Sequence, residues 1–174
     1  TSYEEDNTKH EYILQAVNNE VFKKPALVME NIVKVTDYLV GHVENPREVV
    51  KVIRTHSGGF HHKDRDGFFW RMYDFVKDSI CLDRPENTED FYQCAVAFGK
   101  FQRYLSEFPA YTLHETIPNF HNTPKRYNDF LKAVEEDKMG RAALVQDEIN
   151  FIKERADFYS VLIDSNKAGV LPLR

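Results

Sequence analysis

The spacing of apolar residues between Pro25 and Val40 constrains the fold of this chain more than any other feature. Four apolar residues recur there at steps of four, three and four: Val28, Ile32, Val35 and Leu39. This spacing places them on one face of an α-helix. Pro25 suits the first helical turn, and Gly41 can end the helix. The sequence therefore predicts a helix over residues 25–40.

Strand patterns lie on both sides of this helix. Residues 12–17, with the sequence Tyr-Ile-Leu-Gln-Ala-Val, are rich in strand formers and predict a buried strand. Residues 48–56 carry Val and Ile, residues 63–67 end in an Asp-Gly turn signal, and residues 68–76 are aromatic. We therefore predict a hairpin in which residues 48–56 pair with residues 67–76.

From Thr88 onward the pattern is helical. Apolar residues recur at helical spacing over residues 88–107, 123–137 and 140–165, and Asn122 or Thr123 can cap the second of these helices. The order of elements predicts an α+β fold, with a small antiparallel sheet and one helix followed by a mainly helical second part.

Composition narrows the class of protein. The chain has 174 residues, of which 42% are hydrophobic, and this indicates a folded domain. Its net charge of -5 and the lack of a basic stripe argue against nucleic acid as a partner. No apolar run in the sequence is long enough to span a membrane, and no signal peptide is visible, so we expect a cytoplasmic protein. Cys81 and Cys94 are expected to be reduced and packed.

Few residue patterns point to chemistry on their own. The neighbouring His61 and His62 diverge in a strand, so we interpret them, with His56, as exposed turn residues and not as metal ligands. His121 precedes a capped helix and is either a site residue or a helix-entry residue that binds backbone carbonyls. Asp74 lies in an apolar strand and marks an edge, a site or an exposed strand position. The sequence contains no Gly-x-Ser-x-Gly and no P-loop motif.

Six sequence blocks, taken in order, resemble one known family. They are residues 12–15 with 18 and 21–22, 29–32 with 35–36, 66–67 with 70–73, 97–102, 115–123 with 126, and 169–174. The third block reads Asp-Gly and then Trp-Arg-Met-Tyr, and the fifth reads Glu-Thr-Ile-Pro-Asn-Phe-His-Asn-Thr. The family is that of the N-acetylhexosamine 1-kinases, some of which carry the label "mucin-desulfating" protein. They belong to the aminoglycoside-phosphotransferase superfamily, which has a protein-kinase-like fold.

This resemblance implies a partial kinase fold. Residues 1–80 would be part of the small lobe, with a helix C that carries Glu30 and a hinge at the end of the last strand. The hinge residues Met72, Asp74, Phe75 and Val76, together with Glu30, are then expected to bind the nucleotide. Residues 81–174 would be the first helices of the large lobe, where His121 and Arg126 are expected on the sugar side of the cleft. The parent protein would use ATP and Mg²⁺ to phosphorylate the anomeric hydroxyl of an N-acetylhexosamine.

Two departures from the family pattern modify this expectation. The third strand of a kinase normally carries a basic residue, but the candidate positions here are Gln15 and Ala16, so Glu30 is left without an obvious partner. The sequence also contains no catalytic loop and no acidic metal-binding motif of the family type. We therefore assign no catalytic residue and no metal ligand, and we expect an inactive piece of a kinase.

A different class of protein fits the same sequence. The alternative is a non-catalytic binding module that contacts a partner through Phe68, Phe69 and Trp70. A truncated kinase lobe would leave apolar helix faces exposed, and we expect these to favour a homo-oligomer.

Overall fold

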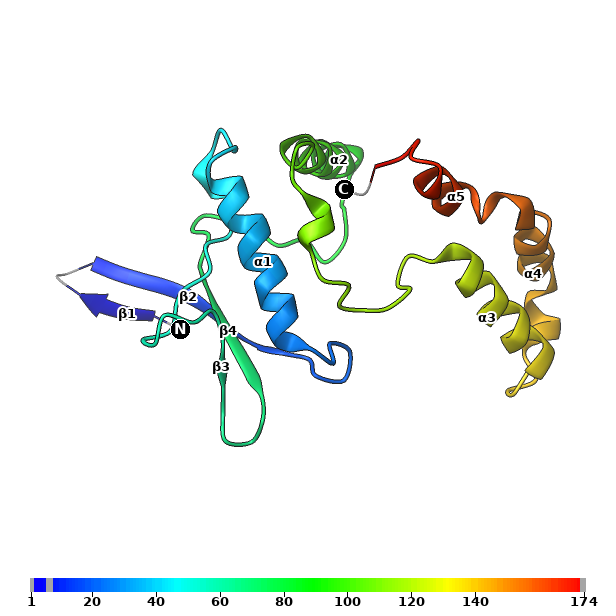
Figure 1. Cartoon of the computed structure of the whole chain (residues 1–174), viewed down its shortest axis with the longest axis horizontal. Coiled ribbons are helices and arrows are strands. Elements are labelled where there is room, and N and C mark those ends of the chain that lie inside the picture. The colour runs from blue at the N-terminus through cyan, green and yellow to red at the C-terminus, as the bar shows by residue number, and fades with distance from the viewer. Residues whose placement is uncertain (1, 6–7, 173–174) are drawn as a thin grey trace. The chain divides into compact units, whose positions relative to one another are not determined.

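The computed structural model describes residues 2–5 and 8–172 of the chain. The chain divides between Ile117 and Pro118 into two compact units. The first unit contains the strands and the helices α1 (Pro25–Val40) and α2 (Thr88–Tyr104), and the second contains α3 (Thr123–Glu136), α4 (Gln146–Lys153) and α5 (Val161–Lys167), as Figure 1 shows. A small antiparallel sheet followed by helices confirms the predicted α+β class. The predicted division at residue 80 stays a prediction.

The sheet of the first unit is antiparallel and has the strand order β1-β2-β4-β3. Its strands are β1 (Ser2–Glu5), β2 (Thr8–Val17), β3 (His62–Lys63) and β4 (Phe69–Asp74). Residues 12–17 form a strand as predicted, and they pair with β4 along its length. The prediction that this strand is buried is wrong, because Val17 is buried but Ile13 and Leu14 are 44% and 47% exposed. Strand-forming residue types indicate the backbone conformation, and the layer that covers the strand decides its burial.

The predicted hairpin of residues 48–56 with residues 67–76 is only partly correct. Ile53 N donates to Met72 O at 2.9 Å, and Asp74 N donates to Lys51 O at 3.1 Å, so this segment does run beside β4. It is not a continuous strand: residues Pro46–Glu48 form a 3-10 helix, and Val52 makes a single bridge to Tyr73. The chain turns back on itself between Thr55 and Gly59, where Thr55 N donates to Gly59 O at 2.8 Å. The regular hairpin pairing is therefore between the two residues of β3 and β4.

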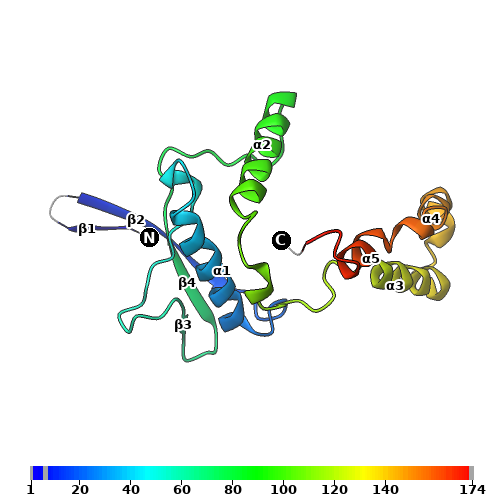
Figure 2. The same ribbon diagram turned by 45° about the horizontal axis from the view of Figure 1, so that its top comes forward.

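Helix α1 has the predicted bounds, from Pro25 to Val40, and lies next to the sheet in both views (Figures 1 and 2). Its buried residues are Pro25, Val28, Met29, Val33, Thr36 and Leu39. The predicted stripe residues Ile32 and Val35 are only half-buried. A second layer lies against the helix, since the ring of Tyr38 meets that of Phe108 edge-on at 5.1 Å. The buried face is therefore rotated from the predicted stripe, because the helix packs on more than the sheet.

Helix α2 begins at a capping box in which Asn87 accepts from Asp90 N and the Asp90 carboxylate accepts from Asn87 N. This arrangement satisfies backbone donors that a helix start leaves free. The apolar face of α2 is largely uncovered, since Phe91 and Phe98 are 63% and 65% exposed. Cys94 on this helix and Cys81 before it are free and exposed, so the prediction that both cysteines are packed is wrong.

In the second unit, Asn122 caps α3 by accepting from Lys125 N at 2.9 Å, as predicted. The helix predicted over residues 140–165 is instead broken into α4, α5 and two 3-10 turns (Ala142–Val145 and Ala156–Phe158). Side chains stabilise the break locally. Arg155 Nη1 donates to Phe151 O and the Tyr159 hydroxyl donates to Ile152 O, both at 2.7 Å. They bind carbonyls at the end of α4, where a helix leaves its last carbonyls without helical partners.

Candidate functional site

The predicted hinge follows β4 directly and lies at a hollow of the first unit. This hollow has a volume of about 420 Å³ and is lined by residues 74–77 and by five residues of the 46–51 segment. Asp74 ends β4, and Phe75 and Val76 follow it, so these three predicted residues line the hollow. Met72 does not line it. Met72 lies with Leu14 and Trp70 at a smaller hollow of about 120 Å³.

The backbone of this segment is partly engaged. Asp74 N donates to Lys51 O at 3.1 Å, and Phe75 N donates to Glu11 O at 3.0 Å. The Val76 carbonyl accepts from the Ser79 hydroxyl at 2.7 Å. Among the residues that the structure describes, no group accepts a hydrogen bond from Val76 N. The same holds for Lys77 N, so the backbone N–H groups of Val76 and Lys77 are candidate donors to a ligand.

A second hollow, which we call the α1–β4 groove, lies between helix α1 and the sheet. It has a volume of about 400 Å³ and is lined by Asn31, Ile32, Val35, Thr36, Val50, Arg71 and Tyr73. Val50 also lines the hollow at the hinge, so the two adjoin there. Burial raises the pKa of the Tyr73 phenol, and the charge of Arg71 opposes that increase. Most of the groove surface is apolar, and Arg71 is the one charged residue among those that line it.

Arg71 is held by the strand opposite. In the sheet register Gln15 pairs with Arg71, and Gln15 Oε1 accepts from Arg71 Nε at 3.0 Å and from Arg71 Nη2 at 2.7 Å. The guanidinium also lies 5.3 Å from the ring centre of Tyr73. Local sequence patterns do not predict this pairing, because the two residues are 56 positions apart.

Glu30 has a partner, contrary to the expectation from sequence. His114 Nε2 lies 2.7 Å from Glu30 Oε2. The neighbouring Asn31 side chain makes two further hydrogen bonds of 2.8 Å, one to His114 O and one from His114 N. Lys34 Nζ adds a bond of 2.8 Å to Thr112 O. We call this set of contacts the α1–His114 clamp. It holds Glu30 against His114, and these two residues are 84 positions apart, too far for a local sequence pattern to reveal the contact.

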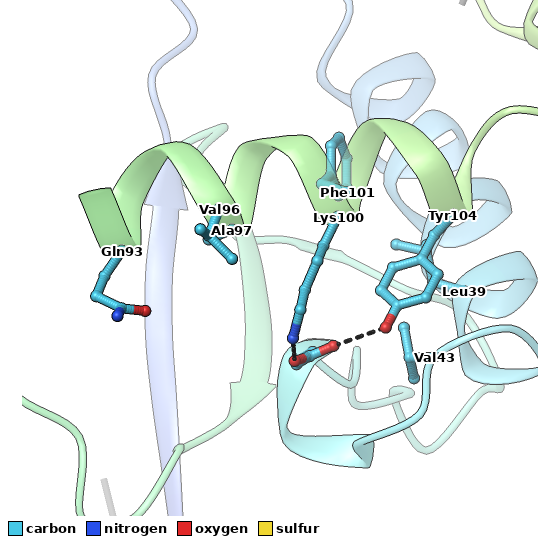
Figure 3. A pocket seen from close by; sticks show the side chains of 9 residues that line it. Leu39, Val43, Gln93, Val96, Ala97, Lys100, Phe101 and Tyr104 are labelled. Atoms are coloured by element: carbon cyan, nitrogen blue, oxygen red, sulfur yellow. Dashed lines mark hydrogen bonds and ion pairs between the residues drawn. The ribbon is translucent and has the colours of Figure 1, made fainter. Parts of the chain in front are cut away.

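Figure 3 shows a third hollow of about 370 Å³ in the first unit, between the end of α1 and the side of α2. Most of its lining is apolar, but Glu48 accepts from Lys100 Nζ and from the Tyr104 hydroxyl, each at 3.2 Å. The Glu48 carboxylate holds the pKa of the Lys100 ammonium above its ordinary value. Glu48, Lys100 and Tyr104 thus bind one another, and we interpret this hollow as part of the packing between α1 and α2.

The residues predicted for the sugar side lie in the second unit. Arg126 Nε donates to Phe120 O at 2.6 Å, and its guanidinium lies 5.1 Å from the Phe120 ring centre. The His121 ring meets the same Phe120 ring edge-on at 4.7 Å. Both side chains are exposed. His121 and Arg126 thus share Phe120, and they lie in a different unit from the predicted hinge.

The remaining predicted positions fit structural roles. His56 is an exposed turn residue as predicted. The prediction is wrong for the other two, because His62 is exposed but lies in β3, and the half-buried His61 ring lies 5.3 Å from the Phe69 ring. Of the alternative binding residues, Phe68 is exposed, whereas Trp70 is half-buried and donates to Asp64. Over residues 2–5 and 8–172, no three His, Cys, Asp or Glu side chains are grouped to hold a metal ion.

Comparison with models of known protein families finds no match for the chain. The described helices include none that is both long and apolar enough to cross a membrane.

Proposed function

We propose that this chain is the nucleotide-binding part of an ATP-dependent sugar kinase, whose whole form phosphorylates the anomeric hydroxyl of an N-acetylhexosamine. The observation that supports this best is the course of the first unit. Strand β2 leads into helix α1. The chain then returns as β4, which pairs with β2 and ends at a hollow. In the proposal this end of β4 is the hinge, an amino sugar is the second ligand, and the protein is cytoplasmic.

The described residues fit an adenine nucleotide at the hinge. The hollow is bordered by apolar side chains of Val49, Val50 and Phe75, which suit a planar base, and Val76 N is an available donor. Among the described residues no three His, Cys, Asp or Glu side chains are grouped, and we assign no Mg²⁺ ligand to this chain. We therefore derive no step through a metal, and the proposal concerns nucleotide binding. When bound, ATP supplies the phosphoryl group that the parent enzyme would transfer.

A binding titration tests this proposal. Trp70 is the one tryptophan of the sequence and lies in β4, so its fluorescence reports on the first unit. We expect saturable quenching by ATP and by adenosine, and a weaker response to inorganic triphosphate, which lacks the base. Calorimetry with the same ligands provides an independent readout. Absence of saturable binding by both adenine compounds in both assays would refute the proposal.

The proposal assigns binding, and not turnover, to the 174 residues. The sequence contains no segment of the catalytic-loop type, so we expect no phosphoryl transfer from ATP to an N-acetylhexosamine. An assay with purified chain, labelled ATP and Mg²⁺ checks this expectation. Transfer above the background rate would show that another group in the chain acts as the base.

One observation favours the alternative of a non-catalytic interaction module. Helix α2 exposes Phe91 and Phe98 on the same side as Cys94, and an exposed apolar face is typical of a binding surface. The titration above separates the two functions, because a pure interaction module has no affinity for adenosine.

A further inference from the structure

The cation of the α1–β4 groove, Arg71, has neutral partners only. Its described contacts are the Gln15 amide oxygen and the Tyr73 ring. No carboxylate of a described residue forms an ion pair with it. Arg71 as a residue is half-buried, but its bonds to Gln15 lie at the exposed surface. The unpaired positive charge is therefore open to an anion from solvent.

The guanidinium has donors left for such an anion. It carries five N–H groups, of which Gln15 takes one on Nε and one on Nη2. Because Gln15 accepts both bonds on a single oxygen, it fixes the orientation of the guanidinium plane without neutralising its charge. The planar fork of N–H groups that remains matches the oxygens of a phosphate.

Arg71 lies close enough to the predicted hinge for one ligand to contact both. Arg71 lies three residues before the end of β4, which corresponds to about 10 Å along a strand. The groove that contains Arg71 adjoins the hinge hollow at Val50. A ligand with a base at the hinge and phosphates directed along β4 can therefore reach both.

We infer that Arg71, oriented by Gln15, binds the phosphate groups of the nucleotide and supplies the cation that the β2 strand lacks at Gln15 and Ala16. This inference rests on the proposed function and adds a specific phosphate-binding residue to it. The sheet register gives the reason, since it places Arg71 directly opposite Gln15 on the neighbouring strand. The positive charge is thus present at this point of the sheet, but it comes from β4.

The test compares Arg71→Gln with a matched control, Arg54→Gln. Arg54 is an exposed arginine of the same unit that also lies over an aromatic ring, that of Phe60, but it does not line the groove. Affinities for ATP, adenosine and inorganic triphosphate are measured by calorimetry and Trp70 fluorescence. We expect Arg71→Gln to weaken ATP binding at least about tenfold and adenosine binding less than about twofold. Arg54→Gln should change neither.

Each result is decisive. If ATP and adenosine bind but Arg71→Gln leaves ATP affinity unchanged, the inference fails and the proposed function stands. If neither adenine compound binds, the proposed function fails and the inference fails with it. If triphosphate alone binds as tightly as ATP and Arg71→Gln abolishes both, the residue binds free phosphates and the nucleotide assignment is overturned. Should Arg71→Gln fail to fold by circular dichroism, Arg71→Lys keeps the charge without the fork and should give an intermediate loss of ATP affinity.

Discussion

Asp64 organises the turn that leads into β4. Its Oδ1 accepts from Asp66 N at 3.0 Å and from Phe68 N at 2.8 Å, and its Oδ2 accepts from the Trp70 indole N–H at 2.7 Å. Gly67 completes the turn with a φ of 91°, which a side chain would strain. The hydrogen bond from Trp70, followed by those from the backbone, holds the pKa of the Asp64 carboxyl below its ordinary value of 3.8.

This lowered pKa predicts a pH-dependent contribution to stability. A carboxyl whose folded pKa is depressed stabilises the fold above its unfolded pKa and loses that contribution as pH falls through the folded value. We expect wild type to be more stable than Asp64→Asn at neutral pH and the difference to shrink below about pH 4. Unfolding in denaturant, followed by Trp70 fluorescence, measures it. Asp66→Asn, in the same turn, is the control, and a difference that persists unchanged in acid would contradict the prediction.

At the scale of single residues, the sequence predicted local contacts and missed distant ones. The Asp-Gly turn and the Asn122 cap depend on neighbours in sequence, so residue type was sufficient to predict them. Glu30 with His114, Arg71 with Gln15 and Lys100 with Glu48 are separated by 84, 56 and 52 positions. Nothing in a local pattern specifies such pairs. The phosphate-binding cation we infer was therefore invisible before the strand register was known.

At the scale of elements, α2 contains one residue that weakens it. Gly99 lies in the helix interior, and a Cβ added there meets no atom within 4 Å. Glycine in a helix costs conformational entropy that alanine does not. Gly99 therefore makes α2 less stable than the same helix would be with alanine at this position.

We expect Gly99→Ala to stabilise the first unit by about 1 kcal/mol. The readout is the free energy of unfolding from urea denaturation monitored at Trp70. Gly67→Ala is the matched control, because its positive φ makes the same substitution destabilising by about 1–2 kcal/mol. A loss of stability in Gly99→Ala would mean that another group occupies the space beside the helix in solution.

Helix starts followed the sequence where it carries a start signal, a proline in the first turn of α1 and a capping asparagine before α3. Pro25 and Asn122 mark helix starts that the structure retains. The predicted helix over 140–165 is broken, and Arg155 and Tyr159 bind carbonyls at the break, which apolar spacing does not report.

At the scale of the whole molecule, exposed apolar surface predicts association. We expect the chain to self-associate, and the double change Phe91→Ser and Phe98→Ser to shift it toward monomer, because both rings are more than half exposed on α2. Light scattering over a concentration series provides the measurement. Tyr111→Ser, which removes an aromatic ring that is 83% exposed but lies outside α2, should leave the distribution unchanged. A wild-type monomer at every concentration would refute the prediction.

The α+β class was predictable from the order of periodic segments, because that order depends on each segment alone. The separation of the chain at Ile117 was not, since it depends on which faces meet.

The α1–His114 clamp has a mechanical consequence. His114 comes three residues before Ile117, where the first unit ends. A force that pulls on the chain where it leaves this unit acts first on the two hydrogen bonds of the Asn31 side chain and on the contact of Glu30 with His114. It acts on the sheet only afterwards. Pulling at the second unit would thus place the force on helix α1 first, and strands β2 and β4 would remain paired until these hydrogen bonds broke.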